Sequence, residues 1–184
     1  MPLNQRYRER RRGQVKISIL AECYTNECLA RVLCEELRGD SLICSTKHSP
    51  SYGMPTVIRK LTEICKRLGA LELLLALVDY EPNSVDRVFI DAITFNDQAL
   101  SRGIHIRQVR CEGRAYAIIL DPRVEDVLGE SREFKVKLRN PDFLRVLKSR
   151  DVCRKHVNLF KSYIESNRAI VDRILEKIVR HTEG

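Results

Sequence analysis

Residues 71–81 read LELLLALVDYE, an almost continuous apolar run that ends in two carboxylates, Asp79 and Glu81. Apolar side chains at successive positions are typical of a strand that is covered on both faces, as in a parallel α/β sheet. Ligands of such sheets bind just beyond the carboxyl ends of the strands. Because residues i and i+2 of a strand face the same way, both carboxylates could reach one cation. The alternative is a solvated turn, because Glu81-Pro82-Asn83 is typical loop sequence.

Alternating strand and helix patterns lead up to this run. We expect a strand over 15–22, a helix over 26–37 with Thr25 as its N-cap, a short strand over 41–44, a polar loop over 45–53 and a helix over 54–68. Connections of helical length predict adjacent parallel strands with right-handed crossovers. The first strand also ends in an acid, Glu22. We therefore expect Glu22, the polar loop, Asp79 and Glu81 to lie at one edge of the sheet.

The second half of the chain continues the alternation less regularly. We expect a helix over 85–99, strands over 104–109 and 115–120, a short helix over 124–128, a loop or edge strand over 135–138, a helix from 140 to about 147, and a long helix or helix pair over 151–180. The predicted fold class is α/β, with a mainly parallel, Rossmann-like sheet flanked by helices. The predicted organisation is a basic flexible arm over 1–13, an α/β domain over 14–147 and a helical C-terminal extension over 148–184.

Composition limits the class of protein. A chain of 184 residues, 43% hydrophobic and 32% charged, is typical of a soluble globular protein with one core. No segment approaches the length of a membrane span, so no membrane association is expected. The N-terminus lacks the apolar centre of a signal peptide, which favours a cytoplasmic location. The sequence leaves the oligomeric state open, a homodimer included.

The formal net charge is +8, and part of it comes from an arginine cluster near the N-terminus. Arg8, Arg10, Arg11 and Arg12 belong to this cluster, which could contact nucleic-acid phosphates or act as a solubilising tail. Aromatic residues make up only 6% of the chain and Trp is absent, which argues against a base-stacking platform.

The seven cysteines have no Cys-x-x-Cys spacing, which argues against a zinc site and a secreted disulfide framework. Most lie in apolar segments, so we expect buried free thiols. The charge-rich composition also permits a hyperthermophilic source, in which intracellular disulfides occur. Cys23, next to Glu22, is not expected to be a nucleophile, because an adjacent carboxylate raises a thiol pKa.

Two acidic motifs resemble a known family. The sequence ECYTNE at 22–27 follows an apolar strand, and ALVDYE at 76–81 ends a later one. Both are similar to motifs of the Toprim domain, which topoisomerases, bacterial-type primases and small nucleases of the overcoming-lysogenisation-defect type share. AYAIILDP at 115–122, the short helix to Gly129 and Asn140-Pro141 are similar to the order in small standalone Toprim-like proteins, so the likeness spans roughly 15–147.

The resemblance implies roles for the acidic residues. Glu22 would be the general acid or base, and Asp79 and Glu81 would bind Mg²⁺ or Mn²⁺ during scission or joining of nucleic-acid phosphodiester bonds. Cys23 stands where the family usually has glycine, and Asn26 where it usually has an acid. Such changes would suit a weakened or repurposed site.

Further candidate residues lie in the polar loop over 45–53. Lys47 could neutralise a phosphate and His48 could transfer a proton, or both could be incidental loop residues. Three functions therefore remain: a Mg²⁺-dependent Toprim-like enzyme acting on nucleic-acid phosphodiesters, a non-catalytic module of the same fold that binds nucleic acid or a protein, and a Rossmann-like enzyme for a phosphorylated small molecule.

Overall fold

The computed structural model describes residues 14–39, 42–48, 53–112 and 114–180. In chain order the elements are β1 (Val15–Ala21), α2 (Tyr24–Leu37), β2 (Leu42–His48), α3 (Gly53–Cys65), β3 (Glu72–Asp79), α4 (Val85–Ile93), β4 (Thr94–Ser101), β5 (Ile104–Val109), β6 (Ala115–Leu120), α5 (Val124–Leu128), α6 (Arg132–Lys137), α7 (Pro141–Leu147), α8 (Val152–Ser166) and α9 (Ala169–Arg180). The predicted arm over 1–13 lies outside the described residues.

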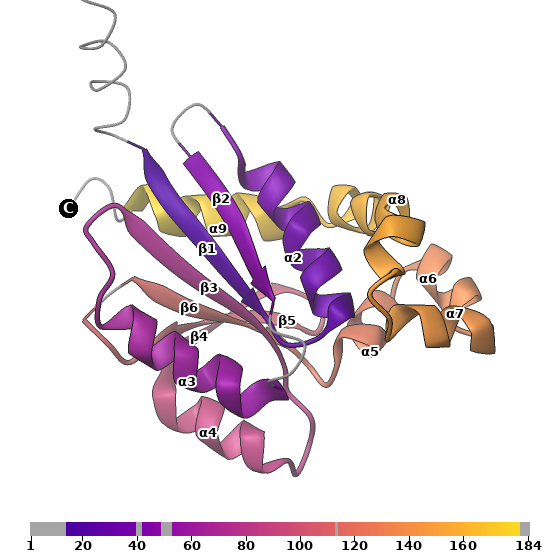
Figure 1. Ribbon diagram of the computed structural model, residues 1–184, viewed down its shortest axis with the longest axis horizontal. Helices are drawn as coiled ribbons and strands as arrows, with labels where there is room; N and C mark the ends of the chain where they lie inside the picture. Colours follow the sequence, from indigo (N-terminus) through magenta and orange to yellow (C-terminus); the bar gives the residue numbers. More distant parts are fainter. Residues whose placement is uncertain (1–13, 40–41, 49–52, 113, 181–184) are drawn as a thin grey trace, which may run out of the picture.

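The strands form one six-stranded sheet in the order β2-β1-β3-β6-β5-β4 (Figure 1). β1 pairs in parallel with β2 and β3, and β3 pairs in parallel with β6. β5 and β4 continue the sheet antiparallel. The α/β class and the mainly parallel sheet are therefore confirmed, and the architecture is consistent with a Rossmann-like or Toprim-like fold.

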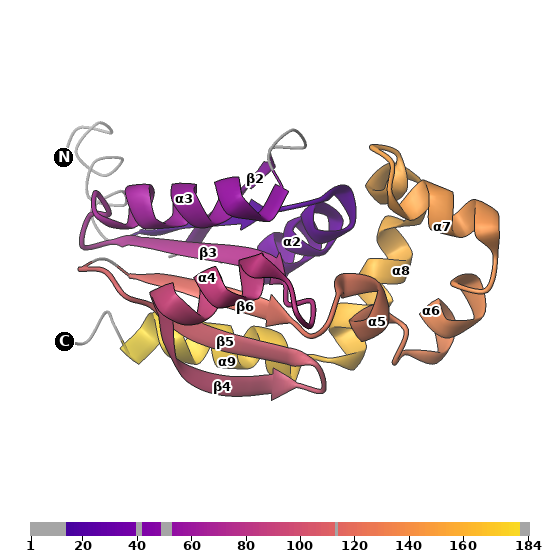
Figure 2. The same ribbon diagram turned by 90° about the horizontal axis from the view of Figure 1, so that it is seen from below.

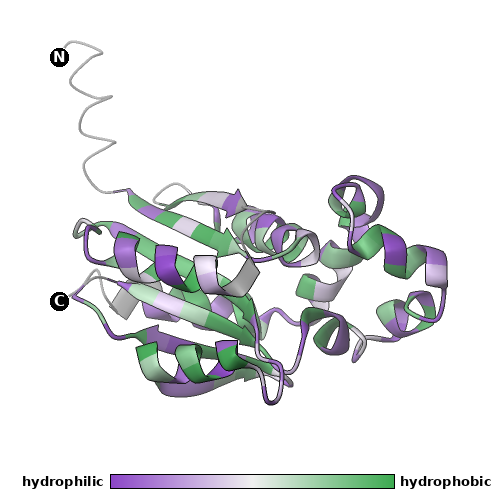
Figure 3. Ribbon diagram, turned by 60° about the horizontal axis from the view of Figure 1, so that its bottom comes forward, coloured by the Kyte–Doolittle hydropathy of each residue, from purple (hydrophilic) through white to green (hydrophobic). Residues whose placement is uncertain are grey.

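Helices cover both faces of the sheet (Figures 1 and 2). α3 and α4 pack on one face, and α2 with the C-terminal helices packs on the other. Because both faces are covered, residues 73–78 of β3 are all buried. The central strands are accordingly hydrophobic along most of their length, whereas the helices alternate between polar and apolar residues (Figure 3).

The C-terminal helices belong to the same core as the sheet. Phe160 and Ile164 of α8 and Ile174 of α9 are at most 1% exposed and pack in the cluster that contains the α2 face of the sheet. The predicted helix pair is confirmed, with the break at Asn167. Among the described residues, no helix is long and apolar enough to cross a membrane.

The helix predicted over 85–99 is wrong in its second half. α4 ends at Ile93, and Thr94–Ser101 is the edge strand β4, which pairs with β5. The turn between them needs Gly103, because its φ is +69° and a Cβ there would lie 3.0 Å from the carbonyl oxygen of Asp121. Thr94 and Phe95 favour a strand, and their pairing outweighs the helical spacing of apolar residues.

Three local expectations also need correction. The stretch predicted as loop or edge strand over 135–138 lies at the end of helix α6, which starts after Ser131, whose Oγ accepts from the N–H of Phe134 at 3.3 Å. The second strand is longer than predicted, so Lys47 and His48 lie in β2 rather than in a loop. Cys23, not Thr25, caps α2.

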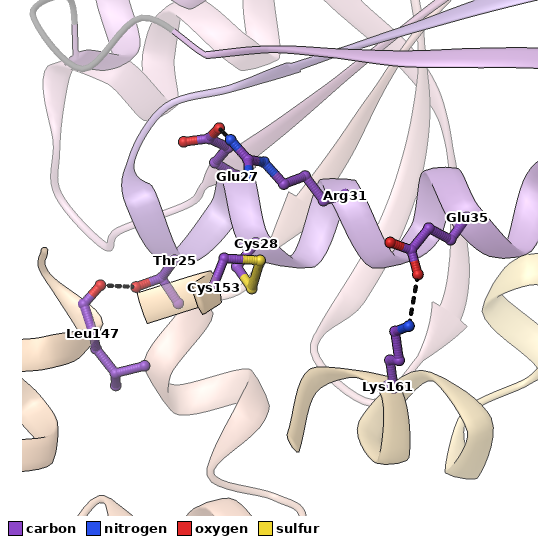
Figure 4. Close-up of a disulfide and its surroundings, with 8 residues drawn as sticks. All are labelled: Thr25, Glu27, Cys28, Arg31, Glu35, Leu147, Cys153 and Lys161. Atoms are coloured by element: carbon purple, nitrogen blue, oxygen red, sulfur yellow. Dashed lines mark hydrogen bonds and ion pairs between the residues drawn. A yellow bond between two sulfur atoms is a disulfide. The ribbon is translucent and has the colours of Figure 1, made fainter. Parts of the chain in front are cut away.

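The expectation of free thiols is wrong for six of the seven cysteines. Three disulfides join Cys28 to Cys153, Cys34 to Cys44 and Cys65 to Cys111, and Cys23 is free. The first two join elements that pack against each other, α2 with α8 and α2 with β2, and the third joins the end of α3 to the segment after β5. The spacing along the chain does not reveal these pairings. The first disulfide joins α2 to α8 (Figure 4).

Candidate functional site

The two acids that follow the central strands lie side by side. Glu22 comes directly after β1, Asp79 is the last residue of β3, and these strands are neighbours. The backbone N–H of Asp79 donates to Oε2 of Glu22 at 3.4 Å. Parallel pairing thus brings residues separated by 57 positions to one edge of the sheet, as the strand pattern predicts.

Two donors from different elements hold the side chain of Asp79. Its Oδ1 accepts from Nδ2 of Asn26 on α2 at 3.4 Å and from the N–H of Val124, the first residue of α5, at 3.1 Å. The end of β3 also positions α5. The N–H of Tyr80 donates to the carbonyls of Leu120 and Pro122, which directly precede α5 in the chain. The orientation of Asp79 therefore depends on three elements.

Tyr80 points to the opposite face of the sheet. It is 4% exposed and packs in the cluster under α3 and α4, where its hydroxyl donates to Oδ1 of Asp91 at 2.7 Å. The guanidinium groups of Arg87 and Arg107 lie 4.3 and 4.8 Å from its ring centroid. This anchoring turns Asp79 toward α2.

Burial and nearby negative charges raise the pKa values of both acids. Burial raises the pKa of Glu22 to about 7, and the charges of Asp86, Glu81 and Glu125 add to the effect. Burial and the charge of Glu22 raise the pKa of Asp79 to about 7, although its bonds from Asn26 and Val124 oppose the shift. Two carboxylates this close are unfavourable as a doubly charged pair, and a bound cation would relieve the repulsion.

Glu81 lies at the rim of the site. β3 ends at Asp79, so the expectation that positions 79 and 81 share one strand face does not apply. The side chain of Glu81 is 53% exposed, and its Oε1 lies 3.8 Å from Nε of Arg123. Arg123 also pairs with Asp126 at 3.1 Å. Glu81 therefore contributes negative charge at the solvent-exposed entrance of the site and does not lie against Glu22.

One cavity of about 520 Å³ contains all three predicted acids. It is also lined by residues that the sequence did not indicate: Arg123 and Glu125 around the start of α5, and Leu144, Leu147 and Lys148 at the end of α7. Thr25 fixes that wall, because its buried Oγ1 donates to the carbonyl of Leu147 at 2.7 Å (Figure 4). The only sequence signal for Glu125 is its place in the first turn of the predicted helix over 124–128.

Cys23 and Asn26 have structural roles at the two positions where the sequence departs from the Toprim pattern. Sγ of Cys23 accepts from the N–H of Asn26 at 3.4 Å and so caps α2. Burial raises the pKa of this thiol to about 12, so it is protonated at neutral pH. Asn26 is fully buried and donates to Asp79, and its Oδ1 has no hydrogen-bond partner among the described residues.

The predicted basic residues are not gathered around the acids. Lys47 lines a separate cavity of about 380 Å³ together with Leu20, Val57 and Lys60, on the α3 side of the sheet. His48 ends β2, and its side chain is outside the described part of the chain. Arg8, Arg10, Arg11 and Arg12 are likewise outside it.

The acid pair suits a hard cation that keeps most of its water. Mg²⁺ is commonly bound through one or two carboxylates, with water completing its coordination, and the oxygens of Glu22 and Asp79 provide this donor set. Within the ranges that the structure describes, no three His, Cys, Asp or Glu side chains are grouped so that they could hold a metal ion. Glu81 or Glu125 would have to move to become a third ligand.

No family model, curated protein or solved structure matches this chain. The Toprim resemblance therefore stays a prediction.

Proposed function

We propose that this protein acts on nucleic-acid phosphodiester bonds in a reaction that depends on Mg²⁺ or Mn²⁺. The observation that supports this best is the meeting of Glu22 and Asp79 at the carboxyl ends of neighbouring parallel strands, in a cavity of about 520 Å³. This is where ligands of open α/β sheets bind. The acidic motifs at 22–27 and 76–81 and the basic net charge of +8 fit the same function.

Each of the three acidic residues would have a different role in the reaction. Asp79, held by Asn26 and Val124, is the fixed ligand, and Glu81 at the rim is the adjustable one. Glu22 receives one hydrogen bond from the main chain. It would share the cation with Asp79 through water, which leaves it placed to exchange a proton with a substrate oxygen. A bound Mg²⁺ would neutralise charge on the phosphate and orient it.

The test is nicking of a supercoiled plasmid by purified protein with Mg²⁺ or Mn²⁺. We expect nicking that EDTA stops, and a loss of about 100-fold or more in Glu22→Gln and in Asp79→Asn, because each change removes a charge but keeps an oxygen acceptor. Glu63→Gln, on an exposed part of α3, is the matched control and should nick at the wild-type rate. Equal activity of Glu22→Gln and wild type would contradict the proposal.

A second candidate is a non-catalytic module that binds nucleic acid or a protein partner. The neutral Asn26 at a position where the resembling family carries an acid, together with the absence of a three-residue metal cluster among the described residues, favours this candidate. It predicts salt-sensitive oligonucleotide binding that survives both Glu22→Gln and Asp79→Asn and weakens when residues 1–13 are removed, with no nicking under any condition.

A further inference from the structure

Two cavities meet at the side chain of Tyr24. The carboxylate cavity of about 520 Å³ lies on one side of it. A second cavity of about 290 Å³ lies on the other, between α2 and the start of α8. Lys148 lines the first cavity and Arg150 the second, and only Ser149 separates them in the chain. The two recesses are therefore neighbours along one surface, with the half-buried Tyr24 between them.

The cations at this junction differ in how far they are neutralised. Arg31 pairs with Glu27, and Arg154 pairs with Asp151 at 3.0 Å. Within the described ranges, no carboxylate pairs with Lys148 or Arg150. Nε of Arg150 donates instead to the hydroxyl of Tyr24 at 2.9 Å. Lys148 and Arg150 are both exposed, so two positive charges without a carboxylate partner among the described residues lie at this junction, one of them at the hydroxyl of Tyr24.

The junction is held in place from three points (Figure 4). Thr25 donates to the carbonyl of Leu147, directly before Lys148. The Cys28–Cys153 disulfide joins α2 to the first turn of α8, and Lys161 pairs with Glu35 at 2.8 Å further along the same two helices. A surface held in this way needs little ordering when it binds a ligand.

We propose that a single strand of nucleic acid runs from the carboxylate cavity across Tyr24 into the second cavity. Lys148 and Arg150 would contact successive phosphates, and the ring of Tyr24 would stack against one base. This inference rests on the proposed function, because it takes the phosphate next to Glu22 and Asp79 as the reacting one. Arg150 would keep Tyr24 in position through its hydrogen bond.

The geometry favours a single strand over a duplex. The reacting phosphate must enter a recess to reach Glu22, which is half-buried. A flexible strand can follow such a recess and turn a base onto an aromatic side chain, which is how single strands are commonly bound. One tyrosine suffices for this and no aromatic platform is needed, which agrees with the low aromatic content of 6%.

The experiment measures binding separately from catalysis. A fluorescein-labelled oligonucleotide of about 12 nucleotides is titrated in Mg²⁺ with full-length protein that carries Glu22→Gln, which we expect to bind without cleaving. Fluorescence anisotropy is read at several salt concentrations. On this background, Lys148→Ala/Arg150→Ala is compared with Arg59→Ala/Lys66→Ala. The second pair also removes two positive charges from exposed positions, Arg59 on α3 and Lys66 directly after that helix. Circular dichroism checks that each variant is folded.

We expect the Lys148/Arg150 pair to weaken binding about tenfold and to reduce the salt slope by about 1.4, as two lost phosphate contacts would. The Arg59/Lys66 pair should change the slope little. Tyr24→Leu should weaken binding about tenfold with the slope unchanged, because stacking carries no charge. Oligonucleotides of the same sequence in DNA and RNA form, and a duplex, are run in parallel, and the tighter single strand identifies the ligand.

Equal weakening by both alanine pairs, no weakening by the Lys148/Arg150 pair, or tighter binding of the duplex would overturn the proposed path. Binding of a phosphorylated peptide in preference to every oligonucleotide would overturn it as well. The proposed path and the proposed function can be refuted independently of each other. If the Lys148/Arg150 dependence is found but wild-type protein with Mg²⁺ or Mn²⁺ cleaves neither the plasmid nor the bound single strand, the path stands and the enzyme proposal falls. If the protein nicks and the Lys148/Arg150 substitutions change neither nicking nor binding, the enzyme proposal stands and the path falls.

Discussion

Asp79 shows at the scale of single residues how the site balances opposing effects. Burial and the nearby charge of Glu22 raise its pKa, whereas the hydrogen bonds from Asn26 and Val124 lower it. Asn26 stands where the Toprim pattern has an acid, and there it supplies a donor instead of a third negative charge. The position therefore supports Asp79 rather than binding a cation. Glu22 and Asp79 are left as the pair on which metal binding depends.

This pair predicts how stability depends on pH without metal. Both folded-state pKa values are raised to about 7 from ordinary values of 4.5 and 3.8, so the folded state binds more protons than the unfolded state between these limits. The contribution of this pair to the free energy of unfolding should therefore be fully present below about pH 4 and be lost as pH rises through about 7, by several kcal/mol in order of magnitude. Urea unfolding in EDTA at pH 5 and pH 8 measures this difference.

Asp79→Asn removes one charge and keeps the acceptor oxygen, so it should reduce the pH difference by more than half. Asp142→Asn on α7 is the control. It makes the same chemical change at a side chain that is 84% exposed and therefore well solvated. It should keep the wild-type pH difference. A pH difference in Asp79→Asn as large as in the wild type would mean that the repulsion does not exist.

At the scale of elements, the sequence predicts best where a strand is buried on both faces. The apolar runs before Glu22 and Asp79 predict β1 and β3, and helical crossovers predict their parallel pairing, so the acid pair follows from local pattern. Thr94–Ser101 and α6 are missed because their apolar spacing fits more than one structure, and pairing or capping decides between them.

The rest of the site depends on contacts between distant elements. Glu125 and Lys148 reach the cavity because α5 and α7 are positioned by the Val124–Asp79 and Thr25–Leu147 hydrogen bonds, which span 45 and 122 positions. No local pattern encodes such contacts. The prediction that Lys47 lies in a loop near the acids is wrong because β2 extends further than its apolar residues indicate. Lys47 pairs with Leu20 of β1, and this strand position directs its side chain toward α3.

The disulfide between α2 and α8 gives a prediction at this scale. It closes a loop of 125 positions, so opening it with Cys153→Ser should lower the free energy of unfolding by about 2–4 kcal/mol in oxidising buffer. Chemical denaturation measures the loss. In a strong reductant, wild type and variant should converge, because the bridge is then absent from both. If Cys153→Ser remains less stable than wild type by the same free energy in reductant, the loss comes from the packing of the Cys153 side chain and not from the disulfide.

At the scale of the whole molecule, the sheet and the C-terminal helices make the site together. The carboxyl ends of β1 and β3 supply the carboxylates. The N-cap Arg123 and Glu125 of α5 lie beside them, and α7 supplies the wall of Leu144 and Leu147. α8 and α9 share the core of the sheet, so this wall is part of the folded unit. The net charge of +8 contrasts with the acidic cavity, which suits an anionic chain that must approach carboxylates with the help of a cation.

The proposed function requires that Glu22 and Asp79 share one divalent cation. A crystal soaked in Mn²⁺ and measured at an anomalous wavelength tests this most directly, because the metal can be located independently of the protein model. We expect one strong anomalous peak within about 2.5 Å of a carboxylate oxygen of Asp79, with Glu22 bound directly or through water, and no peak in Asp79→Asn. A fully loaded crystal with no peak between these two carboxylates, or with the same peak in Asp79→Asn, would contradict the claim.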